Sequence, residues 1–172
     1  MIFLLGIMMS GIMAFTSVYA KQQNLTTVAW FFFAAAIAGV VIRPFSGRIF
    51  DFKGPFLVLL PASLGLLVSI FLIIYSKTNL MLIIAGVFYG AADGAIFPTI
   101  QAWVLKKAGI AKREVATSMF LNCYDFGMGI GASILGKVAD LTSYRFMFIV
   151  LAFIAAFYIL LCFYFPRKKS TR

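Results

Sequence analysis

The chain of 172 residues contains no histidine, only two cysteines and only five acidic residues. Without histidine it cannot build a histidine-ligated zinc site or a serine–histidine hydrolase, whether in water or within a membrane. Cys123 and Cys162 both fall in apolar runs, and two cysteines are too few for a disulfide framework. The sequence therefore predicts a protein that is not an enzyme and that holds no metal and no cofactor.

Charged residues are also scarce. They make up 12% of the chain, whereas hydrophobic residues make up 63%. A soluble domain is about half apolar and a quarter charged, so this chain could not cover a surface that faces water. The composition predicts an integral membrane protein. The net charge of +10 does not indicate a nucleic-acid partner, because the basic residues cluster between apolar runs and near the C-terminus instead of forming one face.

Six apolar runs are long enough to cross a bilayer as helices of about 20 residues. They cover residues about 1–20, 26–46, 55–76, 80–103, 115–138 and 144–165. The polar segments between them are short, so neighbouring spans should be antiparallel. The runs are too long for barrel strands, which have about 10 residues and alternate in polarity. The predicted fold class is an all-α membrane protein in which six transmembrane helices form a single domain.

The basic residues are shared unequally between the two sides of this arrangement. One side, which includes the C-terminal tail, holds eleven of them, and the other holds only Lys21, Lys77, Lys137 and Arg145. The positive-inside rule places the richer side, and both ends of the chain, in the cytoplasm. Residues 1–20 could instead be a signal peptide, but they lack the usual basic start. We expect a multi-pass protein of the plasma membrane.

Two short segments repeat the pattern Gly, basic, apolar, apolar, Asp. Residues 47–51 end the second run and residues 136–140 end the fifth. The two copies lie three spans apart, so they fall on opposite sides of the membrane. Repeats of inverted topology are a signature of secondary transporters. The alternative is that both copies reflect only what is common where a span ends.

Three segments together resemble the C-terminal six-helix half of a major facilitator superfamily (MFS) transporter of the efflux type. They are Arg-Pro-Phe-Ser-Gly-Arg-Ile-Phe-Asp-Phe-Lys-Gly at 43–54, Arg-Glu-Val-Ala-Thr-Ser at 113–118 and the glycine-rich run at 125–132. The resemblance covers all six spans and implies a three-plus-three inverted repeat. It also implies alternating access with a second six-helix half, either a missing N-terminal half or another chain. The expected activity is export of a small-molecule substrate by a proton antiporter.

The same resemblance picks out a cytoplasmic loop motif that latches helices together. Its residues here are Arg43, Gly47, Arg48, Asp51, Gly54 and Arg113. Asp51 could cap the N-terminus of the third span, where the helix dipole favours an anion, or it could pair with Arg113. Phe52 and Pro55 stand where the family usually has bases. The alternative is that these charges only set the orientation of the chain.

Two carboxyl groups lie inside spans. Asp93 and Asp125 are each about ten residues from the cytoplasmic end of their span, which places both about 15 Å deep, near the midplane. Carboxyl groups in lipid are costly and usually mark a pathway or a proton relay. Asn122 shares a helix face with Asp125, and Gln101 lies two turns from Asp93. We predict that these four residues bind substrate or couple protons.

The fourth span should be interrupted beside Asp93, because Pro98 cannot donate to the carbonyl of Gly94. Two other roles for the carboxyl groups stay open. They could be protonated and hydrogen-bond between helices, or they could each meet a base of the second half. If neither group takes part in transport, the chain could be a six-span scaffold or assembly partner.

Glycines repeat at intervals of four residues on two spans. The set is Gly86, Gly90 and Gly94 on the fourth span, with Gly127 and Gly131 on the fifth. Such faces let helix backbones approach closely in membranes. We therefore expect both faces to be sites of helix packing.

Overall fold

The structure, a computed structural model, describes residues 1–164. Within that range it contains six α-helices and no strand, which confirms the all-helical class. The helices are α1 (Ile2–Gln22), α2 (Val28–Lys53), α3 (Phe56–Ile74), α4 (Asn79–Ala108), α5 (Arg113–Leu141) and α6 (Tyr144–Tyr164), with a short 3₁₀ helix η1 (Ile110–Lys112) before α5. The end of the sixth predicted span and the basic tail lie outside the described residues.

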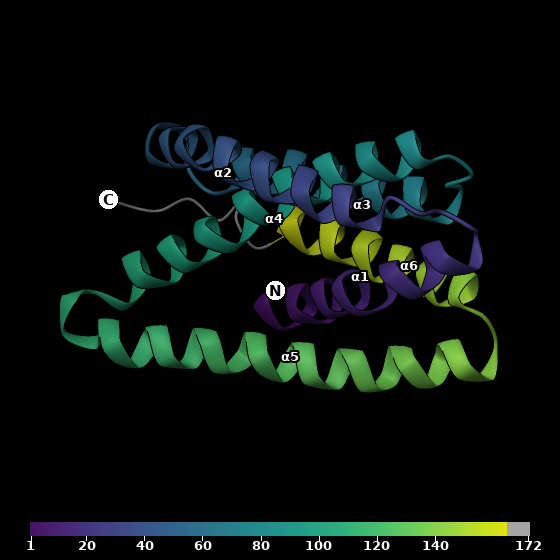
Figure 1. Cartoon of the computed structure of the whole chain (residues 1–172). Coiled ribbons are helices and arrows are strands. Elements are labelled where there is room, and N and C mark those ends of the chain that lie inside the picture. The colour runs from purple at the N-terminus through teal and green to yellow at the C-terminus, as the bar shows by residue number, and fades with distance from the viewer. Residues whose placement is uncertain (165–172) are drawn as a thin grey trace.

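The six helices run back and forth along one common direction (Figure 1). Short connections join them, so that each helix is antiparallel to the next one in the chain. Helix α5 lies along one edge of the bundle, and the C-terminal part of α4 slants away from the body to meet it (Figure 1). The α4–α5 connection therefore projects from the end of the bundle.

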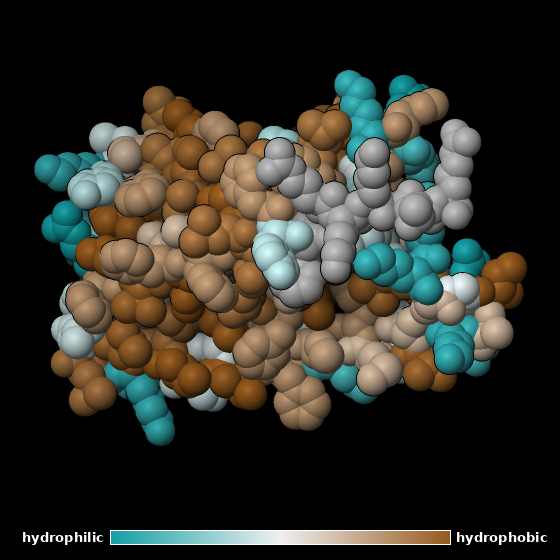
Figure 2. All heavy atoms as spheres, turned by 180° about the vertical axis from the view of Figure 1, so that it is seen from behind, coloured by the Kyte–Doolittle hydropathy of each residue, from teal (hydrophilic) through white to brown (hydrophobic). Residues whose placement is uncertain are grey.

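Five of the six helices are long and apolar enough to cross a membrane: α1, α2, α3, α4 and α6. Helix α5 has 29 residues but is less apolar than these five, and it carries Asp125 and Lys137 within its length. Length does not distinguish helix α5 from the others, but its glycines and polar residues make it less apolar. Figure 2 shows hydrophobic side chains across the middle of one face and hydrophilic side chains toward its two ends.

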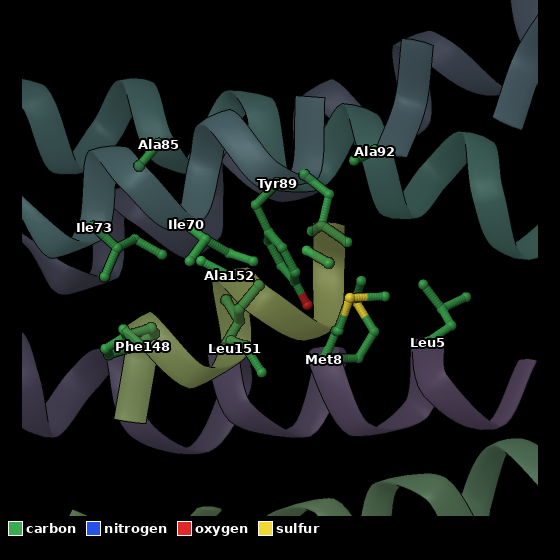
Figure 3. Close-up of a cluster of buried hydrophobic side chains, with 14 of the residues drawn as sticks. Leu5, Met8, Ile70, Ile73, Ala85, Tyr89, Ala92, Phe148, Leu151 and Ala152 are labelled. Carbon is green, nitrogen blue, oxygen red and sulfur yellow. The ribbon is translucent and has the colours of Figure 1, made fainter. Parts of the chain in front are cut away.

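The core lies between α1, α3, α4 and α6. Leu5 and Met8 of α1, Ile70 of α3, Tyr89 of α4 and Leu151 of α6 are all buried there and face one another (Figure 3). Two buried hydrogen bonds join helices across this core. Tyr19 Oη donates to the carbonyl of Ile74 at 2.9 Å, and Ser69 Oγ donates to that of Ala85 at 2.8 Å. Packing and such hydrogen bonds are what hold helices together in lipid.

Glycines set the two closest helix crossings, α2 on α4 and α1 on α5. A Cβ on Gly86, Gly90 or Gly94 would meet the backbone of Phe31, Ala35 or Gly39 in α2. On the other crossing, Gly127 lies against the backbone of Phe3, and Gly131 lies against that of Ile7. All five glycines therefore occupy positions where only a hydrogen atom fits.

Two features of the helices differ from what the apolar pattern suggests. Helix α2 does not end at residue 46 but continues to Lys53, and its terminator is Gly54, whose φ of 82° lies in the left-handed region that favours glycine. Helix α4 runs without a break from Asn79 through Pro98 to Ala108, so the expected interruption beside Asp93 is absent. One missing hydrogen bond at a proline is tolerated in membrane helices, where neighbouring helices support the backbone.

Candidate functional site

Asp93 lies half-buried on α4, at a cavity of about 480 Å³. The other residues that line this cavity are Arg43, Phe97, Pro98, Gln101 and Tyr124. A second hollow of about 290 Å³ opens on the other side of Asp93 and is again lined by Arg43, together with Tyr89. Arg43 and Asp93 therefore stand together where the two hollows meet, between α2 and α4.

Among the described residues, Arg43 is the basic residue that interacts with Asp93. The two side chains interact electrostatically, although no nitrogen–oxygen pair closer than 4.0 Å joins them in the part of the chain that the structure describes. Arg43 lies ten residues before the end of α2, which places it about 15 Å from that end. The sequence pattern groups it with a cytoplasmic loop motif, whereas the structure places it, with an exposed side chain, at the hollows that Asp93 lines between α2 and α4.

Aromatic contacts between α4 and α5 bring part of α5 to the wall of this cavity. The Phe97 ring meets Phe120 and Tyr124 of α5 edge-on, at centroid distances of 5.2 and 5.1 Å. These contacts place Tyr124 in the wall of the cavity, opposite Gln101. Pro98, which also lines the cavity, has no backbone N–H and cannot donate to the carbonyl of Gly94. Of the predicted site residues, the structure brings Asp93 and Gln101 together.

Asn122 and Asp125 line a different hollow, of about 340 Å³, on the exposed face of α5. They share that hollow with Gly129, so their three-residue spacing does place them on one face. Asp125 lines neither of the two hollows described at Asp93. Tyr124, which lines the larger of them, interacts electrostatically with both carboxyl groups.

The residues of the predicted cytoplasmic latch lie toward the end of α2, at Gly54 after it and at the start of α5. Gly47, Arg48 and Asp51 lie on the last turns of α2, and Asp51 faces Pro98 of α4 across a hollow that both line. Asp51 does not cap α3, whose N-cap residue is Pro55, without any side-chain hydrogen bond. Arg113 is exposed at the start of α5, and among residues 1–164 no ion pair joins it to Asp51. The capping role is therefore wrong, because α2 runs past Asp51 before the chain turns.

Sequence reasoning missed two tyrosines of this region. Tyr89 lies one turn before Asp93 on α4 and points toward Met8 of α1 (Figure 3). Its buried hydroxyl has no hydrogen-bond partner among the described residues. The other is Tyr124, beside Asp125 in the chain. The spacing of Tyr89 and Asp93, four residues apart on one helix, was the signal that could have found the first.

The comparisons with known proteins agree with this architecture. The family model described as "Major Facilitator Superfamily" matches residues 1–172. The curated "Staphylopine export protein" of Staphylococcus aureus (strain Mu50 / ATCC 700699) is 28% identical over 75 residues. That match covers 38% of this chain and 18% of the relative, so the chain spans only a small part of the relative's length. The chain is therefore a multi-pass membrane protein that belongs to the Major Facilitator Superfamily of transporters.

Proposed function

We propose that this chain is one six-helix half of a plasma-membrane carrier that exports a small solute in exchange for protons by alternating access. The observation that carries the proposal is the pair Arg43 and Asp93, which face a cavity between otherwise apolar helices. A carboxyl group and a guanidinium inside a membrane bundle are costly, and such groups mark substrate and ion pathways. Gln101 and Tyr124 supply neutral hydrogen-bonding groups in the same cavity.

The pattern of helix contacts supports a three-plus-three inverted repeat. Exchange of α1 with α4, α2 with α5 and α3 with α6 converts the close α2–α4 crossing into the close α1–α5 crossing. Both crossings are made by glycines that lie against a backbone. Such repeats, with a site near the bilayer midplane, are the architecture of secondary carriers.

Two helices support the existence of a second six-helix half. Only 11% of the apolar stretch of α2 is buried, compared with 50% of those of α1 and α4. Helix α5 presents Asn122 and Asp125 on its exposed face, where lipid would be an unfavourable neighbour. A second half packed on α5 and on the side of α2 next to the cavity of Asp93 would bury these surfaces and enclose that cavity. In the orientation that we propose, both ends of the chain lie in the cytoplasm. The end of α2 that carries Arg48 then lies on the cytoplasmic side of the membrane.

The coupling that we infer uses competition for Asp93. A proton that enters from outside neutralises the carboxylate and removes its attraction for Arg43 and for a polar solute. Release of that proton to the cytoplasm restores the negative charge and permits solute to bind again. Asp125, Asn122 and Gln101 complete the polar lining on the side that faces the second half.

The test is proton-driven uptake into everted membrane vesicles that contain the full carrier, with staphylopine as one probe because the named relative exports it. Asp93→Asn should lower uptake under an imposed proton gradient at least tenfold, and it should lower exchange of labelled for unlabelled solute as well, because the neutral side chain copies the protonated state that does not hold solute. The matched control is Asp140→Asn, the same change at an exposed position on the last turns of α5.

Two results would contradict the proposal. Full proton-driven uptake by both Asp93→Asn and Asp125→Asn would remove these carboxyl groups from coupling. Failure of any solute to accumulate, with normal insertion of the protein, would favour a six-span scaffold or assembly partner. Panels of small cations, anions and zwitterions should accompany staphylopine, so that a wrong probe is not mistaken for an inactive carrier.

A further inference from the structure

An apolar groove lies on the outer side of α2, α3 and α4, away from the cavity of Asp93. Its volume is about 280 Å³. Its walls include the bulky side chains Phe45, Ile49, Leu57 and Phe88, each of which is at least 40% exposed. The site is therefore open to lipid and is built entirely from helices of this chain.

Small residues form the floor of the groove. Ala62 and Gly65 of α3 lie opposite Ala91 and Ala95 of α4. Neighbouring exposed positions of the same helices carry large side chains, such as Leu64 of α3. The slot lies where these small residues of α3 and α4 meet, with larger side chains such as Leu57 and Phe88 at its sides. A narrow apolar slot of this kind fits a single acyl chain.

A basic residue stands at one end of the slot. Ile42, Phe45, Ser46 and Ile49 line it at intervals of three and four residues, and Lys53 continues the same face of α2 one turn further on. Lys53 is exposed, and the first turn of α3 beside it contains no acidic residue. The nearest carboxylate along the chain, Asp51, lines a hollow on the other side of α2.

We propose that this groove binds one anionic phospholipid, with an acyl chain in the slot and its phosphate at Lys53. Charge complementarity argues for this occupant, because anionic headgroups gather around basic residues at the membrane surface. The lack of polar groups along the slot argues against a water-soluble solute: the one hydroxyl there, Ser46 Oγ, already donates to the carbonyl of Arg43 at 3.0 Å. The inference does not depend on the transport activity proposed above.

Native mass spectrometry of the full chain, released from nanodiscs of equal phosphatidylglycerol and phosphatidylcholine, tests the proposal. We expect one phosphatidylglycerol to be retained preferentially. Lys53→Gln should lower that preference about fivefold, the effect of one basic residue on an anionic lipid. Lys77→Gln, the same change in the connection at the other end of α3, should leave it unchanged.

Filling the slot provides the second arm. A Cβ at Gly65 would meet only Phe88 Cδ1, at 3.9 Å, so Gly65→Leu should fold and block the slot. It should abolish retention of phosphatidylglycerol, whereas Ala156→Leu, on an exposed position of α6, should not. Photoreactive phosphatidylglycerol on the unmodified chain should label α3 and α4 peptides. Equal retention of the two lipids, equal effects of Lys53→Gln and Lys77→Gln, or labelling elsewhere would each overturn the proposal.

Discussion

Gly90 offers the sharpest test of the packing that holds α2 against α4. In Gly90→Ala, the new Cβ would meet the carbonyl and Cα of Ala35, closer than real Cβ atoms come. These are backbone atoms, so no rotamer change can relieve the contact. The two helices must move apart, and a gap of about 1 Å removes up to half of each dispersion contact across the crossing.

The size of the effect follows from two opposing contributions. Overpacking costs about 1–3 kcal/mol, whereas alanine favours a helix over glycine by about 1 kcal/mol. Gly47→Ala provides the matched control, because its Cβ would have no neighbour within 4 Å and only the helix preference would act. We therefore expect the two variants to differ by about 1–3 kcal/mol in their free energy of unfolding. At 2–4 °C per kcal/mol for a chain of this size, their midpoints should differ by about 2–12 °C.

The chain contains its own probe for this measurement. Cys162 is completely buried on α6, whereas Cys123 is exposed. In a Cys123→Ser background, a thiol-reactive dye should report the unfolding temperature through Cys162 alone. A midpoint for Gly90→Ala equal to or above that of Gly47→Ala would refute the reasoning that only a hydrogen atom fits at Gly90.

The same thiol assay checks two further contacts, and a transport assay checks a third. Ser69→Ala removes a buried hydrogen bond between helices and should cost about 0.6–1.5 kcal/mol, whereas Ser133→Ala, whose hydroxyl bonds within its own helix, should have almost no effect; equal midpoints would contradict this. Phe97→Ala loses two ring contacts to α5, and because the ring is only partly buried it should destabilise by about 1–3 kcal/mol; a loss under 1 kcal/mol would show that the rings contribute little. Arg43→Asp and Asp93→Arg should each abolish export, and the double variant should recover it, because the attraction between the two side chains is restored. A double variant as inactive as the single ones would show that the two residues have separate roles.

The helices could be predicted from the sequence because each apolar run is long enough to cross a bilayer. The ends of the helices could not. Apolarity stops near residue 46, but a polar sequence can remain helical beyond the lipid, and only Gly54 and Pro55 end α2. At Pro98 the sequence predicted an interruption of α4, but the helix is continuous there. A missing hydrogen bond does not break a helix that neighbouring helices support.

The candidate site was predictable only in part. Asp93 could be picked out because a carboxyl group inside an apolar run is unfavourable in free energy and so suggests a functional role. Arg43 was grouped with the loop motif because a base near the end of an apolar run resembles a boundary marker, and the extra turns of α2 beyond it, which leave it beside Asp93, were not foreseen. Cavities depend on how helices cross, which is why the sequence could not separate the hollow of Asp93 from that of Asp125.

The ring contacts of Phe97 have a mechanical consequence. The N-terminal half of α4 is fixed on α2 by glycines, while Phe97, one residue before Pro98, is joined to α5 by two aromatic contacts. The proline deprives α4 of a hydrogen bond at the junction of these two halves, so bending is easiest there. A bend there would move the C-terminal half of α4 and, through η1, the start of α5, while the ring contacts of Phe97 hold the side before the proline. The pair forms a lever with its pivot at the cavity of Asp93 and its free end at the α4–α5 connection.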